Sequence, residues 1–142
     1  MIATSRKLDA PRVSPQIGWV AAFTVLAWLG EAIHNRADLP DLSLVSPETS
    51  IPALISLLLV LGICLSPWRR LMCLALLSWA WVNLVGGGIL SVLPLPFLPY
   101  HPEQTLFHYL MHVQYVVTQI PLIVVLLQLT RTGSQQERGR LT

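Results

Sequence analysis

Four long runs of apolar residues follow one another along this chain, with short polar or proline-rich segments between them. The runs cover residues 17–34, 51–66, 71–92 and 105–129. As a helix that rises 1.5 Å per residue, residues 17–34 are just long enough to cross a hydrocarbon core of roughly 30 Å. The pattern therefore predicts an all-α integral membrane protein, a four-helix bundle formed by residues 16–130.

The composition agrees with a membrane protein and excludes an ordinary soluble domain. Of the 142 residues, 54% are hydrophobic and 11% are charged, and the mean hydropathy is +0.61. Soluble domains carry about 25% charged residues. The two cysteines, Cys64 and Cys73, lie in apolar runs, where we expect reduced packing residues. The sequence contains no CxxC, HExxH, GxGxxG, P-loop or GxSxG pattern. Short catalytic motifs therefore give no indication of whether the protein is an enzyme.

Short segments indicate where helices begin, weaken and end. Ser46, Pro47 and Glu48 form a typical helix start, with a capping serine, a proline in the first turn and an acid near the positive end of the helix dipole. The glycines at 86–88 are expected to allow a close approach of another helix or a local break that lines a cavity. The proline-rich segment 93–104 cannot be a helix interior. It is predicted to be a stiff connection, either a rigid lid over an outer site or a plain connector.

Lysine and arginine are concentrated in segments that would lie on one side of a membrane. The N-terminal arm, the turn between the second and third runs and the C-terminal tail contain all of them except Arg36: Arg6, Lys7, Arg12, Arg69, Arg70, Arg131, Arg138 and Arg140. By the positive-inside rule we expect a multi-pass protein of the plasma or cell membrane, with both termini cytoplasmic and loops 35–50 and 93–104 outside.

The two ends of the chain are predicted to lie outside the bundle. Residues 1–15 are expected to be a flexible basic arm before an uncleaved signal anchor, since Glu31 interrupts the first run and further spans follow it. Residues 131–142 are expected to be a disordered basic tail. We interpret this tail as a determinant of topology and not as a nucleic-acid binder, with anionic lipid as its main other partner.

A polar stripe runs along the fourth apolar segment. His108, His112, Tyr115 and Gln119 follow one another at steps of three or four residues, which places them on one face of a helix. A polar stripe in an otherwise apolar helix needs a partner, because unpaired polar groups are costly in hydrocarbon. With the predicted topology, the histidine end of this stripe lies at the outer side of the membrane.

The first span brings a second pair of polar residues to the same depth. Glu31 and His34 end this span, so they would meet His108 and His112 if the first and fourth helices were neighbours. Three imidazoles and a carboxylate form a ligand set that suits zinc, iron, manganese or copper. The predicted metal ligands are Glu31, His34, His108 and His112. A b-type haem is the alternative cofactor, with His34 paired to one of the other two histidines.

Other polar residues are assigned around these ligands. Asn83, Tyr115 and Gln119 are expected to support the ligands through hydrogen bonds. His101 and Glu103 lie in the outer loop and are expected to guard the entrance. The lead hypothesis is therefore a small membrane protein with an outward-facing His/Glu site for a transition metal or haem.

Two other functions fit the same residues. The chain could be a non-enzymatic accessory or assembly subunit of a larger membrane complex, in which the histidines form a structural polar network. This hypothesis predicts that the stripe of the fourth span faces away from the first span. The chain could instead be a proton-coupled carrier, acting as a homodimer. A carrier needs a polar path beyond Gln119, where the sequence is apolar from Pro121 to Leu127.

Overall fold

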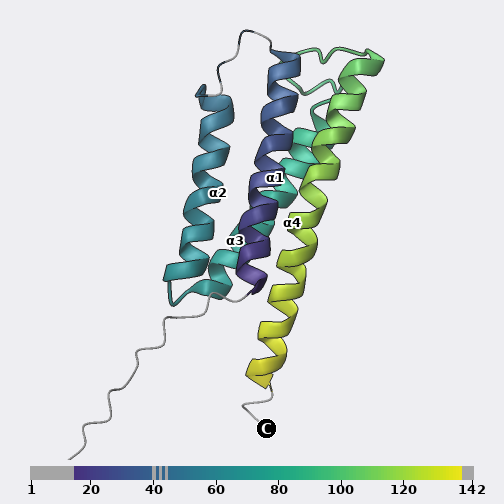
Figure 1. Ribbon diagram of the computed structural model, residues 1–142. Coiled ribbons are helices and arrows are strands. Elements are labelled where there is room, and N and C mark those ends of the chain that lie inside the picture. Colours follow the sequence, from purple (N-terminus) through teal and green to yellow (C-terminus); the bar gives the residue numbers. More distant parts are fainter. Residues whose placement is uncertain (1–14, 40, 42, 44, 139–142) are drawn as a thin grey trace, which may run out of the picture.

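The computed structural model describes residues 15–39, 41, 43 and 45–138, with side chains as far as Arg131. It is an all-α four-helix bundle, as the apolar runs predict (Figure 1). The elements in chain order are α1 (Pro15–Asp38), α2 (Pro47–Leu65), α3 (Arg69–Val82), the π-helix η1 (Asn83–Leu90) and α4 (Leu106–Arg138). The π-helix continues α3 directly, so α3 and η1 together form the third rod of the bundle.

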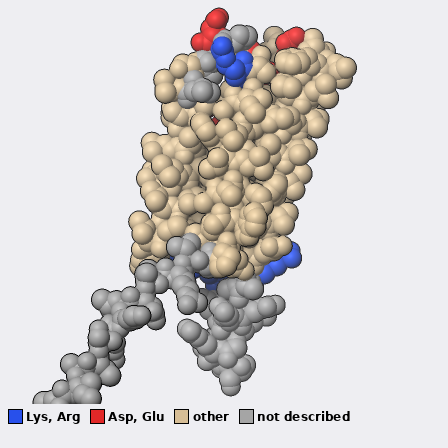
Figure 2. All heavy atoms as spheres, in the orientation of Figure 1, with Lys and Arg blue, Asp and Glu red and all other residues tan. Residues whose placement is uncertain are grey.

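All four rods are long and apolar enough to cross a membrane. The candidate spans are Pro15–Asp38, Pro47–Leu65, Arg69–Leu90 and Leu106–Arg131. Figure 2 shows that the charged side chains lie at the two ends of the molecule, and that the face between them is nearly free of charge. A bilayer would surround this uncharged band. Which end faces the cytoplasm stays a prediction.

The helices α1 and α4 share the most extensive interface of the bundle (Figure 1). α3 and η1 pack against α4, whereas α2 lies at the edge, in contact with α1 and α3. The neighbouring first and fourth helices that a shared His/Glu site requires are therefore present. We call their interface the α1–α4 seam.

The apolar core and the polar residues occupy different halves of the bundle. Val20, Ile63, Leu76 and Leu126 are almost completely buried, and they come from the first half of α1, the end of α2, the middle of α3 and the distal half of α4. Buried histidines come from the other ends of α1 and α4. The apolar half holds the helices together by packing, and the opposite half of the α1–α4 seam contains the polar groups.

The helix bounds differ from the predicted runs in ways that matter for the site. α1 continues four residues beyond His34, where a loop was expected. The Asp38 carboxylate lies 3.4 Å from His34 Nε2 at i,i+4, and the Leu39 amide donates to the Asn35 carbonyl. A helix continues as long as such local contacts compensate for the conformational entropy that is lost when each further residue is ordered. The extension places the Asp38 carboxylate at the end of the α1–α4 seam.

The start of α2 and the end of α4 are the other differences. Ser46 is the N-cap and Pro47 and Glu48 lie in the first turn, as predicted, but the Ser46 hydroxyl makes no capping hydrogen bond. The tail was predicted to be disordered from residue 131, yet α4 continues to Arg138, since Gln and Glu favour helix and no proline follows. The flexible arm was predicted for residues 1–15. Residues 1–14 lie outside the described residues, and Pro15 is the first residue of α1.

Of the glycines at 86–88, Gly87 and Gly88 allow a close approach of α4, and the third rod continues through all three. They lie within η1, where the backbone is π-helical. A Cβ added at Gly87 would lie 3.0 Å from the Tyr115 ring and hydroxyl, and one added at Gly88 would lie 2.6 Å from Val116. Larger residues would therefore separate η1 from α4.

Candidate metal centre

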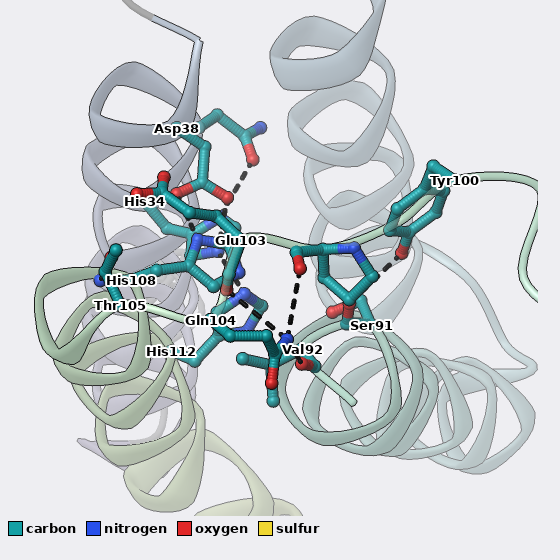
Figure 3. A network of polar contacts seen from close by, with 12 residues as sticks. His34, Asp38, Ser91, Val92, Tyr100, Glu103, Gln104, Thr105, His108 and His112 are labelled. Carbon is teal, nitrogen blue, oxygen red and sulfur yellow. Dashed lines mark hydrogen bonds and ion pairs between the residues drawn. The ribbon is translucent and has the colours of Figure 1, made fainter. Parts of the chain in front are cut away.

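Three side chains at the loop end of the α1–α4 seam converge on one point. His34 and Asp38 come from the last turns of α1, and His112 comes from α4 (Figure 3). One ligand atom from each of the three lies within 4.8 Å of the others, an arrangement that could hold a metal ion. The helical spacing explains the convergence, because residues four apart on α1 share the face that α4 covers.

The distances between these atoms are close to those in a metal site. His34 Nε2 lies 2.9 Å from His112 Nε2 and 3.4 Å from Asp38 Oδ2. Two ligands at about 2.0–2.2 Å from a tetrahedral ion are about 3.3–3.6 Å apart. The His34–Asp38 separation already falls in this range, and the two imidazole nitrogens would need to separate by only about 0.4 Å to reach it.

The imidazole of His112 is held in the orientation that a ligand needs. Its Nδ1 lies 3.0 Å from the Gly88 carbonyl oxygen. A carbonyl only accepts hydrogen bonds, so Nδ1 carries the hydrogen and the lone pair is on Nε2, which faces His34. Metal-binding histidines typically donate their other ring hydrogen to a carbonyl or carboxylate in this way. The π-helical end of the third rod supplies this carbonyl.

His34 has an acceptor for the hydrogen that would have to move when a metal binds. In the metal-free contact His34 Nε2 is the donor, since His112 Nε2 bears a lone pair and Asp38 accepts on the other side. As a metal ligand through Nε2, His34 would carry its hydrogen on Nδ1. The Asn35 side-chain oxygen lies 3.3 Å from Nδ1 and can accept that hydrogen.

His108 joins this group through the carboxylate of Asp38. Its Nδ1 lies 2.9 Å from Asp38 Oδ1, and its ring centroid is 4.6 Å from that of His112. The other ring nitrogen, Nε2, is buried and has no hydrogen-bond partner. His108 therefore orients the carboxylate and also presents an unpaired nitrogen inside the protein, which a ligand or a metal-bound group could satisfy.

The site is enclosed except near Asp38. His34, His108 and His112 have exposed fractions of 9%, 6% and 4%, whereas the Asp38 side chain is 22% exposed. Burial among apolar helices strengthens the attraction between a cation and its ligands. Asp38 thus lies where an ion would enter.

Glu31 lies on the same face of α1 as His34, one turn deeper. It is 8% exposed, and its carboxyl group forms no hydrogen bond or ion pair with another described residue. It is close enough to interact electrostatically with Tyr115. The three-residue group does not include Glu31. Its predicted role as a ligand stays a prediction.

The residues assigned as hydrogen-bonding supports lie below the group along the α1–α4 seam. The Tyr115 hydroxyl donates to the Asn83 side-chain oxygen at 3.3 Å. The Gln119 side-chain amide donates to the Ala27 carbonyl at 3.3 Å. These hydrogen bonds hold α4 against η1 and α1. Neither of them involves a histidine, but the Tyr115 ring lies against the His34 ring, with 5.4 Å between the centroids.

The connection before α4 is tied to the end of the third rod. The Gln104 side chain donates to the Val92 carbonyl at 3.1 Å, and the Tyr100 hydroxyl donates to the Ser91 carbonyl at 3.4 Å (Figure 3). Gln104 also accepts a hydrogen bond from the Tyr109 hydroxyl. The two residues assigned to the entrance, His101 and Glu103, are exposed in this connection. Their role at an entrance stays a prediction.

Asp38 is the residue that sequence reasoning missed. It was assigned to the outer loop because the apolar run ends at His34. A signal was present, since Glu31, His34 and Asp38 stand at i, i+3 and i+7, the spacing of one continued helical face.

Comparisons with protein-family models, with curated proteins and with solved structures found no match to this chain. Any function must therefore be argued from the site itself.

Proposed function

We propose that this chain is an integral membrane protein that binds one transition-metal ion through His34, Asp38 and His112, at the non-cytoplasmic end of the α1–α4 seam. The observation that carries the proposal is the convergence of two imidazole nitrogens and a carboxylate oxygen within 4.8 Å. The hydrogen bond from His112 to Gly88 supports it, because it leaves Nε2 free to bind an ion.

Two histidines and one carboxylate are a ligand set that suits zinc and iron(II) best. Both ions use three protein ligands of this kind and leave at least one coordination position open for water or another molecule. The Nε2 of His108 is buried without a hydrogen-bond partner, and its ring centroid lies 4.6 Å from that of His112, so we expect it to interact with such an additional ligand. An open position would allow the activation of water or dioxygen, whereas closure by His108 would give a carriage or structural site.

The contact between the histidines favours a bare ion over haem. Two axial nitrogens of one haem lie on opposite sides of the porphyrin, roughly 4 Å apart. His34 Nε2 and His112 Nε2 are in hydrogen-bonding contact at 2.9 Å. A porphyrin between them would require the α1–α4 seam to open.

The same contacts bear on the two other hypotheses. The accessory-subunit hypothesis predicts a stripe that faces away from α1, but His112 and Gln119 both bond to α1. The carrier hypothesis requires a polar path beyond Gln119, but the following buried residues of α4 are apolar: Leu122, Ile123, Val125 and Leu126. Both observations favour a closed-ended binding site.

The test is elemental analysis of the full-length protein, purified in detergent without chelators and offered zinc, iron(II) and copper in turn. We expect about one zinc or iron ion per chain, lost in a His34→Ala/His112→Ala double variant. His101→Ala is the matched control, because His101 is an exposed histidine outside the group, and it should retain the ion.

A visible spectrum of the same samples distinguishes a bare ion from haem. Protein offered haem should show no Soret band that depends on His34 and His112. If the native protein holds no metal above background, or if the double variant holds as much as the native protein, the metal-binding proposal is wrong.

A further inference from the structure

Asn35 connects the metal group to a helix that contributes no ligand to it. Its side-chain oxygen lies 3.3 Å from His34 Nδ1. Its side-chain NH2 group donates to the Glu48 carbonyl and to the Thr49 hydroxyl oxygen, both at 3.4 Å. Glu48 and Thr49 lie in the first turn of α2. One carboxamide therefore contacts a proposed metal ligand on one side and α2 on the other.

The first turn of α2 is the place where hydrogen bonds hold this helix to α1. Among the described residues, every side-chain hydrogen bond between α1 and α2 ends on this turn: the two from Asn35 and one from the Trp28 indole to the Thr49 carbonyl at 3.3 Å. Thr49 is only 1% exposed, so its contacts with α1 are shielded from solvent. The docking of this turn on α1 thus depends in large part on how Asn35 is held.

The direction of these bonds fixes which end of the Asn35 side chain faces the histidine. The Glu48 carbonyl only accepts hydrogen bonds, so the NH2 group of Asn35 must point toward α2. The side-chain oxygen of Asn35 then faces His34 Nδ1. Because this oxygen also only accepts, the contact is favourable only when Nδ1 carries a hydrogen.

Metal binding would change which ring nitrogen of His34 carries the hydrogen. In the metal-free contact His34 donates from Nε2, so the lone pair of Nδ1 faces the Asn35 oxygen and two acceptors meet. An ion bound at Nε2 takes the place of that hydrogen. The Nε2–H bond breaks and an Nδ1–H bond forms, with water carrying the proton between them, so the ring keeps one hydrogen in both states.

The new hydrogen bond would also be stronger than an ordinary one. A metal ion draws charge from the imidazole ring, and hydrogen bonds from a charged donor are roughly twice as strong as those between neutral groups. Occupation of the metal group would therefore replace a contact between two acceptors by a strong hydrogen bond to Asn35.

We propose that Asn35 is a positioning residue that couples the metal group to α2: when a divalent ion binds His34 Nε2, the hydrogen bond from Nδ1 holds the Asn35 carboxamide, which in turn holds the first turn of α2 against α1. The inference rests on the proposed function. Such coupling is reciprocal, so a change that weakens the link through Asn35 also lowers the affinity for the metal.

Zinc chloride is the probe for the test, added in detergent to the full-length native protein and to two variants. Asn35→Leu removes the oxygen and the NH2 group but keeps a branched side chain. Ser50→Ala is the control, because Ser50 lies in the same turn of α2 and its hydroxyl donates only to the Ser46 carbonyl. Nitrogen NMR of the imidazole rings reports which nitrogen of His34 carries the hydrogen. Amide hydrogen exchange reports local opening of α2.

We expect zinc to move the His34 hydrogen from Nε2 to Nδ1 and to slow exchange in the first turn of α2 several-fold, in the native protein and in Ser50→Ala. Exchange at the far end of α2, residues 60–65, should not change. In Asn35→Leu the effect of zinc on the first turn should disappear, and zinc affinity should fall about tenfold.

Three results would overturn the coupling and leave the metal site standing. They are zinc binding that leaves exchange in the first turn of α2 unchanged, a hydrogen on His34 Nδ1 both with and without zinc, and native zinc affinity in Asn35→Leu. The first two need only the native protein, so they decide the point even if Asn35→Leu fails to fold. If the native protein binds no zinc, the proposed function and the coupling both fail.

Discussion

Replacing Gly30 by alanine tests whether the α1–α4 seam is as tight as the structure shows. A Cβ at position 30 would lie 1.8 Å from the Thr118 hydroxyl oxygen and 2.7 Å from Thr118 Cβ. The hydroxyl can rotate away, although it then loses its 2.7 Å hydrogen bond to the Tyr115 carbonyl. The Cβ atom of Thr118 cannot rotate, so the contact at 2.7 Å remains.

The required displacement can be worked out from these distances. An ordinary contact begins at 3.4 Å, so the two helices must separate by about 0.7 Å at this point. Overpacking of this kind typically reduces the free energy of unfolding by about 1–3 kcal/mol. The same opening would carry the His34–His112 contact from 2.9 Å to about 3.6 Å, the upper limit for a tetrahedral pair. We therefore expect a clear loss of stability and little change in zinc affinity.

The assay is thermal or denaturant unfolding in detergent, followed by the helical circular dichroism signal. Gly18→Ala is the matched control, because a Cβ there meets nothing within 4 Å and alanine favours helix by about 1 kcal/mol. A Gly30→Ala/Thr118→Ala double variant should recover part of the loss, since it removes the hydroxyl and methyl groups of Thr118. Equal stability of the Gly30→Ala and Gly18→Ala variants would refute the close approach of α1 and α4.

Two further substitutions probe the metal group. Asp38→Asn keeps an oxygen that can accept a hydrogen bond from His108 but removes the negative charge. Zinc affinity, measured by competition with a chelator, should therefore fall at least about tenfold. An affinity equal to that of the native protein would exclude the carboxylate as a ligand. Gly88→Ala places a Cβ 2.6 Å from Val116 and displaces the carbonyl that orients the imidazole, so zinc affinity should fall by about tenfold. Gly86→Ala is the control for Gly88→Ala, because a Cβ at position 86 meets nothing within 4 Å. A similar zinc affinity in both variants would contradict the role of the Gly88 carbonyl in orienting His112.

The fold follows from the sequence because each helix is long and apolar enough to be recognised by itself. Hydropathy and length identify the four spans, since a membrane segment must satisfy its own backbone hydrogen bonds. The 3.6-residue period also places His108, His112, Tyr115 and Gln119 on one face before any neighbour is known. All four are partly or wholly buried along α4, and His112 and Gln119 contact α1.

The membership of the metal group depends on contacts between helices, which periodicity does not specify. Asp38 belongs to the group because α1 continues past its apolar run, and that extension is accompanied by contacts with His34 and His108. A hydropathy pattern predicts that the helix ends where the apolar residues end. In the structure, α1 ends where its last local contacts are made.

What the sequence alone determined, then, is the number of candidate spans and the shared helix face of His108, His112, Tyr115 and Gln119, because these depend on the geometry of a single helix. The tertiary structure decided which atoms meet. The distance between α1 and α4 depends on how closely Gly30 approaches Thr118, and the orientation of His112 depends on a carbonyl from η1. Such distances arise from packing between segments far apart in the chain, where a shift of less than 1 Å separates a ligand pair from two unrelated side chains.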